Sequence, residues 1–252
     1  MTVAIVDFHS YSESVTAALD SISARKKLSK QSAVLIKPNL VNASPHPVTT
    51  HVDCCEAVLE YVRSCSKADV VIAEGCGDAS RDTDEIFNLL GYRAMAVRHT
   101  VPLVDLNSSP LQRFENKSCS VYSEIYLPEI AFSYFIISLP VLKVHSIAGI
   151  TGTLKNMIGF APPKYYSSGL GGWKKAAFHN HMQQAIIDLN QYRVPDLSLM
   201  DASVGLAEFH LGGRHCSPPV GKMLAGSNPW EVDREAAALL GLDWKKIRHL
   251  TD

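Results

Sequence analysis

The sequence predicts an α/β fold in which helices cover a mostly parallel sheet. Short apolar runs rich in β-branched residues alternate along the chain with stretches of helical periodicity. Polar residues gather directly after several of these runs, where ligands bind in parallel sheets. The 252 residues are 46% hydrophobic and 19% charged, as is usual for a soluble globular protein. We therefore expect one α/β domain over residues 1–252.

Strands are expected where short apolar runs are bounded by polar or turn-forming residues. The expected strands are residues 3–8, 33–37, 69–73, 103–106, 134–139, 197–200 and 223–225. Pro38 ends the second strand, because proline lacks the amide proton that a central strand needs. The most apolar run, residues 132–141, predicts a buried strand that delivers Lys143 and His145 to its carboxyl end.

Helices are expected where apolar residues recur with helical spacing. The expected helices are residues 12–22, 50–64, 83–90, 176–192 and 230–240. The pair Thr49-Thr50 supplies an N-cap for the second helix, and Gly241 closes the last. The polar segment 107–128 predicts an inserted meander or an edge hairpin. Proline, glycine and aromatic residues in segment 161–173 predict a flexible loop that closes over a ligand or contacts a second subunit of a homodimer.

Overall charge and composition exclude several classes of protein. The chain has 24 basic and 25 acidic residues and a formal charge of −1, so we expect neither nucleic acid nor a membrane as a partner. Its start lacks the pattern of a signal peptide, and no apolar stretch approaches the roughly 20 residues that span a bilayer, so a cytoplasmic location is expected. None of the six cysteines forms a C-x-x-C motif, which argues against zinc-ribbon and iron-sulfur sites. Cys76 lies in a glycine-flanked turn and is either a reactive thiol or part of a tight turn.

Four expected strands end in polar residues, and we expect these ends to share one crevice. The ends comprise Lys37-Pro38-Asn39, Glu74 to Asp78, Lys143 to His145 and Asp201 to Gly205. Lys37, Lys143 and Lys155 would converge there with backbone amides of a glycine-containing loop, which includes Gly149, Thr151, Gly152 and Thr153. Such a group suits a carboxylate or a phosphate. Asn39 and Asn156 would orient the ligand, or would cap loops.

Catalytic and metal-binding roles are expected for residues of the same crevice. His145 would act as a general acid or base or as a metal ligand, and Lys143 and Lys155 would lower each other's pKa. A divalent metal would take His145 and His179 with oxygen ligands from Glu74 and Asp201. His179 and His181 would diverge on a helix. His210 and His215 flank a glycine pair that predicts either a lid or a polar surface loop.

The chain resembles the domain of unknown function 362 family over nearly its whole length. The matching segments are residues 34–41, 49–50, 73–75, 139–145 and 151–156 with Gly159, then Asp201, 225–229 and 232–233. The family has no settled activity, so the resemblance implies no reaction. Some members carry iron-sulfur motifs, but the paired cysteines are missing in this chain.

A second, local resemblance is to the nickel-pincer lactate racemases. It rests on His145, Gly149, Gly152 and Lys155, spaced His-x-x-x-Gly-x-x-Gly-x-x-Lys after an apolar strand. The resemblance implies one active-site histidine, a lysine that holds the cofactor covalently, and a nickel-ligating histidine for which His179 or His181 would stand. The turn 75–78 lacks the family's histidine, and residues 37–41 replace its Asp-His-Thr-Arg-Pro stretch. A shared lobe architecture is therefore implied, and a shared racemase activity is not.

These observations favour an enzyme that binds a small anionic metabolite in a lysine- and histidine-lined pocket at the strand ends. The chemistry would be of the isomerase, lyase or hydrolase type, assisted by a metal or another cofactor whose identity the sequence leaves open. The alternative is a non-catalytic module that binds a metal or cofactor or serves electron transfer. A purely structural interaction protein would have no concave pocket around residues 143–155.

Overall fold

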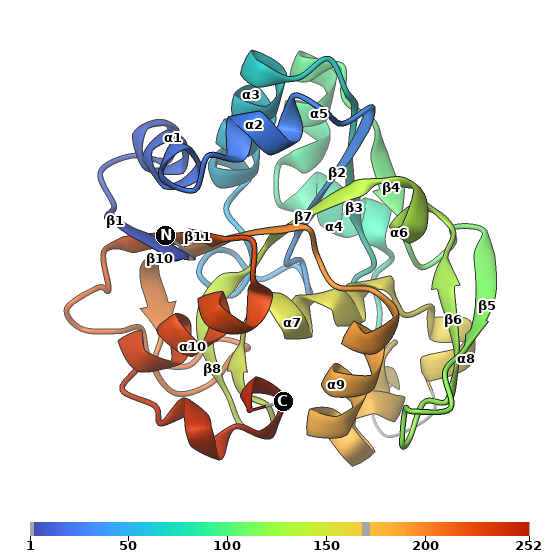
Figure 1. Ribbon diagram of the computed structural model, residues 1–252. Helices are drawn as coiled ribbons and strands as arrows, with labels where there is room; N and C mark the ends of the chain where they lie inside the picture. Colours follow the sequence, from blue (N-terminus) through green and yellow to red (C-terminus); the bar gives the residue numbers. More distant parts are fainter. Residues whose placement is uncertain (1–2, 168–171, 252) are drawn as a thin grey trace.

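A nine-stranded sheet runs through the computed structural model, which describes residues 3–167 and 172–251 (Figure 1). Its strands are β1 (Val3–Asp7), β2 (Ala33–Pro38), β3 (Asp69–Glu74), β4 (Leu103–Asp105), β7 (Phe135–Leu139), β8 (Val141–His145), β9 (Gly149–Thr151), β10 (Leu197–Leu206) and β11 (Lys222–Gly226). The main order is β1-β11-β10-β7-β2-β3-β4. All neighbours from β10 to β4 are parallel, while β11 is antiparallel to both β1 and β10.

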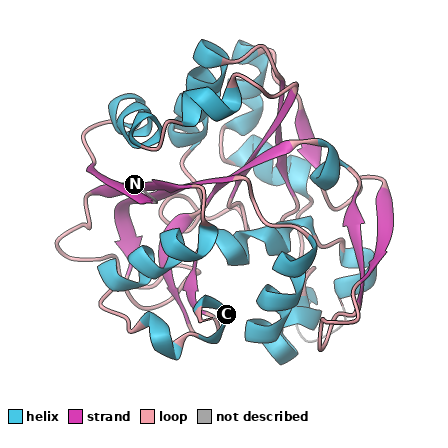
Figure 2. Cartoon of the chain, in the orientation of Figure 1, coloured by secondary structure: helices cyan, strands magenta, loops and turns pink. Residues whose placement is uncertain are grey.

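Helices cover both faces of this sheet (Figures 1 and 2). One face carries α1 (Tyr11–Ser21), α2 (Ala24–Leu28), α3 (Val52–Cys65), α4 (Thr83–Leu89) and α5 (Tyr92–His99). The opposite face carries α7 (Thr153–Asn156), α9 (Met182–Tyr192) and α10 (Pro229–Leu239). The short helices α6 (Ile130–Ser133) and α8 (Pro163–Tyr166) lie beside a separate hairpin of β5 (Leu111–Glu115) and β6 (Glu124–Pro128). The predicted fold class is therefore confirmed.

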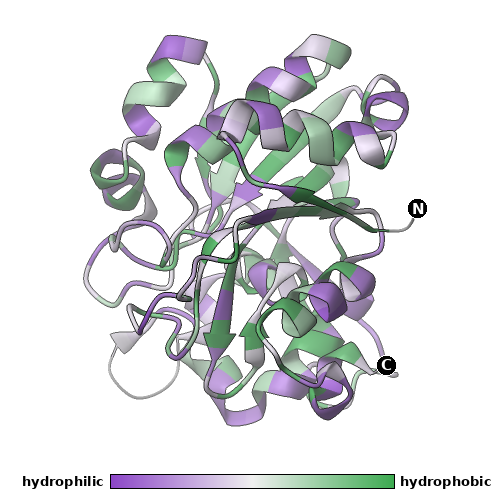
Figure 3. Ribbon diagram, turned by 90° about the vertical axis from the view of Figure 1, so that its left-hand side faces the viewer, coloured by the Kyte–Doolittle hydropathy of each residue, from purple (hydrophilic) through white to green (hydrophobic). Residues whose placement is uncertain are grey.

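The alternation of side chains along the central strands divides the core into two apolar clusters. In β2, Val34 and Ile36 pack with α1, α3 and α5, whereas Leu35 packs with residues of α7 and α9. Each of these three side chains is 0% exposed. Apolar residues accordingly concentrate along the strands and the inner helix faces in Figure 3. The same alternation places Lys37 on the face of Leu35, which is the face that carries the cavity described below.

Local capping sets where several helices begin. The side chain of Ser10 accepts a hydrogen bond from the Glu13 amide at α1, and Asn228 accepts from Trp230 and Glu231 at α10. Helix α3 begins at Val52 rather than at the predicted residue 50, because the Thr50 hydroxyl donates to the Leu139 carbonyl instead. The ring of His51 takes over as the cap of α3.

Several details differ from the sequence-based expectations. Helices α2 and α5 were not predicted, because both are short and α5 has only a weak apolar periodicity. The buried strand predicted at residues 132–141 is shorter, since α6 takes up Ile130–Ser133 and β7 ends at Leu139, and after Pro140 the chain continues as β8, which pairs with β9 and with the second half of β10. The segment 176–192 begins as a 3₁₀ helix, Ala176–His181, and becomes α-helical only at Met182. Strand β10 extends to Leu206 because its second half gains β8 as a partner.

Segments 107–128 and 161–173, for which the sequence left alternatives open, both contain regular structure. Segment 107–128 holds the antiparallel hairpin β5-β6, which forms its own two-stranded sheet and does not extend the main one. Segment 161–173 contains α8, and its residues 168–171 lie outside the described part of the chain. Among the described residues, no helix has the length and apolar character needed to cross a bilayer.

Candidate functional site

A cavity of about 250 Å³ opens at the carboxyl ends of β2, β3 and β8. Its described lining consists of Lys37, Asn39, Val41, Glu74, Gly75, Gly77, His145, Thr151, Lys155, Asn156, Ile158, Gly159, Trp173, Lys175, Phe178, His179, Met182, His210 and Leu211. Most of the sequence-predicted site residues are in this set. Of the others, Lys143 is not part of the lining and donates to Asn39, which is. Asp201 lies in a separate polar cluster with Tyr11.

Lys37 and Glu74 form a fully buried ion pair in the cavity wall. The Lys37 Nζ lies 2.9 Å from both carboxylate oxygens of Glu74 and also donates to the Asn156 Oδ1 at 3.1 Å and the Pro38 carbonyl at 3.2 Å. Burial lowers the pKa of Lys37, and the charge of Glu74 opposes this effect. A Cβ at Gly159 would overlap with both partners, so glycine is required there. The two charges cancel each other and leave no spare donor for a ligand.

Asn156 fixes the short helix α7 onto the strand ends. Its Nδ2 donates to the Lys37 carbonyl and to the Ser138 Oγ, both at 3.1 Å. Its Oδ1 accepts from Lys37 and, at 3.4 Å, from Asn39. Because both ends of this amide have protein partners, its main role is to hold α7 in place, although it lines the cavity.

Asp233 of α10 holds the amino end of α7. This carboxylate is 0% exposed and accepts hydrogen bonds from the backbone amides of Thr153 at 2.7 Å and Leu154 at 3.0 Å. Burial raises the pKa of Asp233 to about 7, against the lowering effect of the two amides. The amides that were predicted to bind an anion therefore already bind one that the protein supplies, while Gly149–Thr151 pair with β8. Gly152 has no room for a Cβ beside this carboxylate.

Lys155 is the cavity-lining lysine to which the described residues offer neither a counter-charge nor a hydrogen-bond acceptor. It is partly buried and lines the cavity one residue before Asn156. Its Nζ has no hydrogen-bond or ion-pair partner within residues 3–167 and 172–251. Burial, together with the nearby charge of Lys37, lowers the pKa of Lys155 to about 8. This lysine is the group best placed to meet an anionic ligand.

His145 presents one ring nitrogen to the protein and leaves the other available. Its Nδ1 accepts hydrogen bonds from the backbone amides of Ile147 at 3.2 Å and Ala148 at 3.1 Å. In the neutral ring the proton is therefore assigned to Nε2. Burial and the charge of Lys155 lower the pKa of His145 far below its usual range, so the ring stays neutral. The ring stacks on His210 with centroids 3.8 Å apart.

His210 and Thr151 complete the polar end of the cavity. Loop 207–214 is anchored by hydrogen bonding between Ala207 and Arg214, and it places His210 against the cavity rather than in solvent. Burial and Lys155 lower the pKa of His210 to about 3. The Thr151 hydroxyl is buried without a hydrogen-bond partner among the described residues, although it lines the cavity. An orphaned buried hydroxyl is uncommon, and at the cavity wall an ordered water or a ligand can satisfy it.

Lys143 does not reach the cavity. Its Nζ donates to the Asn39 Oδ1 at 2.7 Å and to the Val48 carbonyl at 2.5 Å, and the side chain is buried. Burial and the charge of Lys155 lower the pKa of Lys143 to about 7. The predicted catalytic role is thus not supported by its position. Its contacts show that it tethers residues 39–48 to β8.

Lys175 was missed by the sequence reasoning. Its Nζ donates to the Asn107 Oδ1 at 2.6 Å, to the Gly159 carbonyl at 3.3 Å and to the Ala161 carbonyl. Burial lowers the pKa of Lys175 to about 7. All three ammonium protons are used, so Lys175 holds the cavity wall together. The only sequence signal was a pair of lysines after the glycine-rich aromatic segment, which does not distinguish a buried side chain from an exposed one.

The predicted metal ligands do not form a compact set. His145 and His179 line the cavity, and Glu74 is committed to Lys37. Asp201 instead accepts from Tyr11 at 2.9 Å and lies 3.1 Å from the His46 Nε2. Of the two histidines implied by the racemase resemblance, His179 lines the cavity and His181 does not.

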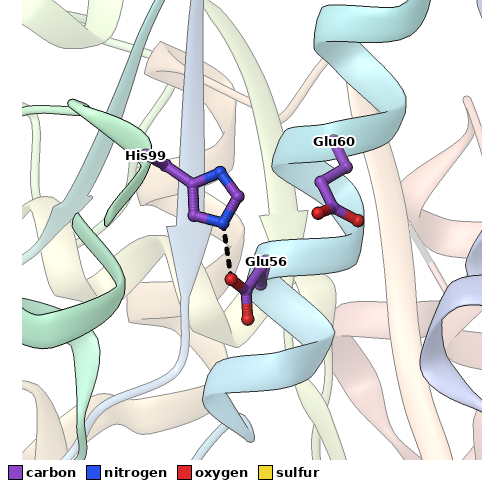
Figure 4. Close-up of side chains that lie close together, drawn as sticks. All are labelled: Glu56, Glu60 and His99. Carbon is purple, nitrogen blue, oxygen red and sulfur yellow. Dashed lines mark hydrogen bonds and ion pairs between the residues drawn. The ribbon is translucent and has the colours of Figure 1, made fainter. Parts of the chain in front are cut away.

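In the part of the chain that the structure describes, only Glu56, Glu60 and His99 bring three metal-binding side chains together (Figure 4). This group lies on the surface. The carboxylate of Glu56 is paired with His99 at 2.5 Å and with Arg98 at 2.9 Å, so those ion pairs account for its arrangement. Cys76 is buried, and burial raises the pKa of its thiol, which favours a structural role in the turn over a reactive thiol.

The fold and the cavity define an α/β protein with lysine and histidine side chains at the carboxyl ends of its parallel strands. The chain belongs to the family described as Domain of unknown function (DUF362), whose model matches residues 34–238. The resemblance inferred from the sequence is thereby confirmed. No curated protein matches the chain.

Among solved structures, the lactate racemase apoprotein from Thermoanaerobacterium thermosaccharolyticum is similar, with a TM-score of 0.59 and 13% sequence identity. The match covers 93% of this chain and 56% of that chain, so this chain spans little more than half of the racemase. At this identity the likeness concerns the fold alone, and it confirms the predicted lobe architecture.

Proposed function

We propose that the cavity binds a small organic anion, with Lys155 as the counter-charge and His145 as a neutral hydrogen-bond donor that polarises it. The observation that carries this proposal is the Lys155 ammonium, which faces a cavity without a partner among the described residues. A poorly solvated charge is costly unless it is paired. A bound anion would supply that pair.

Two further groups support an anion at this position. The Thr151 hydroxyl and the Nε2–H of His145 are donors without protein partners, and both residues line the same cavity as Lys155. Since an imidazole of low pKa is neutral, the Nε2–H of His145 would donate a hydrogen bond to an oxygen of the ligand and polarise it, without a change in the ring's protonation. Polarisation of a bound carbonyl or carboxylate oxygen by a neutral imidazole is used in isomerase chemistry.

Calorimetric titration of the protein with a panel of small carboxylates and inorganic phosphate tests this function. We expect Lys155→Met to weaken binding by about 100-fold or more, since it removes the one lysine of the cavity lining that has no partner among the described residues. Thermal stability should be nearly unchanged, because the ammonium has no partner to lose. Lys117→Met, at an exposed lysine, serves as the matched control and should bind normally. Full affinity in a folded Lys155→Met protein would refute the proposal.

A catalytic protein and a binding module are separated by the behaviour of His145. In a metabolite screen, His145→Gln should retain ligand affinity within a few-fold and lose turnover. If the native protein binds anions and turns over none of them, the non-catalytic alternative is favoured.

A further inference from the structure

We infer that the preferred ligand is a monocarboxylate attached to an apolar body, aromatic or branched, and that phosphates and dicarboxylates are poor ligands. This inference rests on the proposed function and adds the class of ligand. It follows from how donors and apolar surface are distributed around the cavity.

The polar end offers few unused donors. Within residues 3–167 and 172–251 these include the Lys155 ammonium, the Thr151 hydroxyl, the Nε2–H of His145 and the ring N–H of the neutral His210, whose Nδ1 has no partner. The protons of Lys37 and Lys175 are all committed to protein acceptors. One ammonium and three neutral donors supply a single positive charge and enough hydrogen bonds for the two oxygens of one carboxylate.

A phosphate would lack the partners that usually bind it. Helix amino ends and runs of backbone amides are the common phosphate sites in α/β proteins. Here the amides of Thr153 and Leu154, the nearest such site, are bonded to Asp233. The imidazoles of His145 and His210 stay neutral, since burial and Lys155 lower their pKa, so they add no charge against a dianion.

The rest of the wall is apolar and mostly rigid. It is formed by Ile158, Trp173, Phe178, Met182 and Leu211. Phe178 is 0% exposed, and its ring packs against those of Tyr122 and Tyr166, each with its centroid 5.0 Å away. Met182 is 3% exposed and offers a polarisable thioether, which packs well against aromatic rings. A second carboxylate would meet these side chains and find no cation.

The size of the cavity agrees with such a ligand. An apolar cavity of about 150 Å³ holds a benzene ring. The cavity here, at about 250 Å³, has room for a ring and a carboxylate. Burial of the ring should tighten binding about 10- to 100-fold relative to acetate.

Calorimetry with matched ligands tests the inference on the native protein. Phenylacetate should bind at least 10-fold more tightly than acetate, and also more tightly than benzylphosphonate, which keeps the ring, and succinate, which adds a second charge. Equal affinities for phenylacetate and acetate would overturn the inference, as would a preference for benzylphosphonate or succinate. In these cases the proposed function would still stand. If no anion binds at all, the inference and the proposed function both fail.

A variant tests the apolar wall independently. Met182→Lys would add a second cation to the wall of the cavity that Lys155 also lines, and succinate should then gain at least 10-fold in affinity relative to phenylacetate. Met182→Leu is the control and should keep the native order of ligands. An unchanged preference in a folded Met182→Lys protein would contradict the placement of the apolar body. If this variant does not fold, the ligand series on the native protein still decides the question.

Discussion

The charges of the buried lysine side chains at this site are compensated in two ways. Lys37 is neutralised by Glu74, whereas Lys143 and Lys175 are surrounded by carbonyl and amide oxygens. Uncharged oxygens compensate an ammonium less fully than a carboxylate does, and the pKa of each of these two lysines falls to about 7. Lys155 has neither kind of partner among the described residues, and this distinguishes the proposed binding group from the structural lysines.

The pKa of Lys155 predicts how anion binding depends on pH. Binding needs the ammonium, and its pKa is lowered to about 8, so affinity should be constant below pH 7 and fall about tenfold per pH unit above pH 8. Lys155→Arg keeps its charge throughout this range and should remove the dependence. Titrations from pH 6 to pH 9.5 measure both proteins. The same decline in the arginine variant would show that another group is responsible.

Breaking the buried ion pair should be costly. Glu74→Gln leaves the Lys37 ammonium uncompensated, which should lower the free energy of unfolding by about 3–5 kcal/mol in urea denaturation. Glu85→Gln, at a half-exposed carboxylate paired with Arg81, should change it by less than about 1 kcal/mol. The double variant Lys37→Met with Glu74→Leu should recover only part of the loss, because the buried amides of Leu40 and Gly75 also donate to Glu74 and would lose their acceptor. A small effect of Glu74→Gln alone would mean that the pair is not isolated from solvent.

Helix α7 is too short to be stable without its tertiary partners. It spans only Thr153–Asn156, and its position depends on Asp233 at one end and on the Asn156 side chain at the other. Because Lys155 is carried on this turn, α10 controls the placement of the binding group although it does not line the cavity.

Removal of the Asp233 cap should therefore affect both stability and binding. Asp233→Ala leaves two buried amides without an acceptor, which should cost about 2–4 kcal/mol of unfolding free energy. Asp233→Asn keeps one acceptor oxygen and should lose less. Glu235→Ala, on the exposed side of the same helix, is the control. Hydrogen exchange of the Thr153 and Leu154 amides should increase in the alanine variant alone, and unchanged protection would argue against the cap.

The sequence predicts the strands and helices better than it predicts which side chains reach the cavity. The apolar runs that form β2, β3 and β7 were predicted because burial on both faces leaves an unbroken hydrophobic pattern. Lys155 and His145 were identified because they follow such a run. The position of Lys143 was not predictable, since it depends on β8 continuing after Pro140. Lys175 could not be found either, because its partners Asn107 and Gly159 are distant in sequence.

The whole molecule should become more stable as pH rises from 5 to 8.5. The pKa values of His145, His210 and His249 are lowered by burial, so the unfolded chain takes up protons below pH 6.5 that the folded chain does not. Lys143, Lys155 and Lys175 act in the same direction above pH 7, since they lose their protons in the folded state first. Asp233, whose pKa is raised to about 7, lowers the stability as pH rises between 4 and 7. Its effect is smaller than the combined effect of the three histidines in this range.

Urea denaturation at pH 5, 6.5 and 8.5 measures this trend. Lys175→Met should flatten the rise above pH 7 by at most about 1.4 kcal/mol per pH unit, the contribution of one proton. Lys117→Met, at an exposed lysine, should leave the slope unchanged. A native protein that is most stable at pH 5 would contradict the assigned protonation states.

The pairing of β1 with β11 sets an order of events during synthesis. Residues 3–7 hydrogen-bond to residues 222–226, and β11 alone connects β1 to the rest of the sheet in the described chain. A ribosome adds about 5–20 residues per second, so the first strand waits about 10–40 seconds for its partner. During that time β2, β3 and β7 have all been made. The amino-terminal strand therefore remains an unpaired edge while the nascent chain grows, and it is the segment most open to mispairing with other chains or to capture by a chaperone.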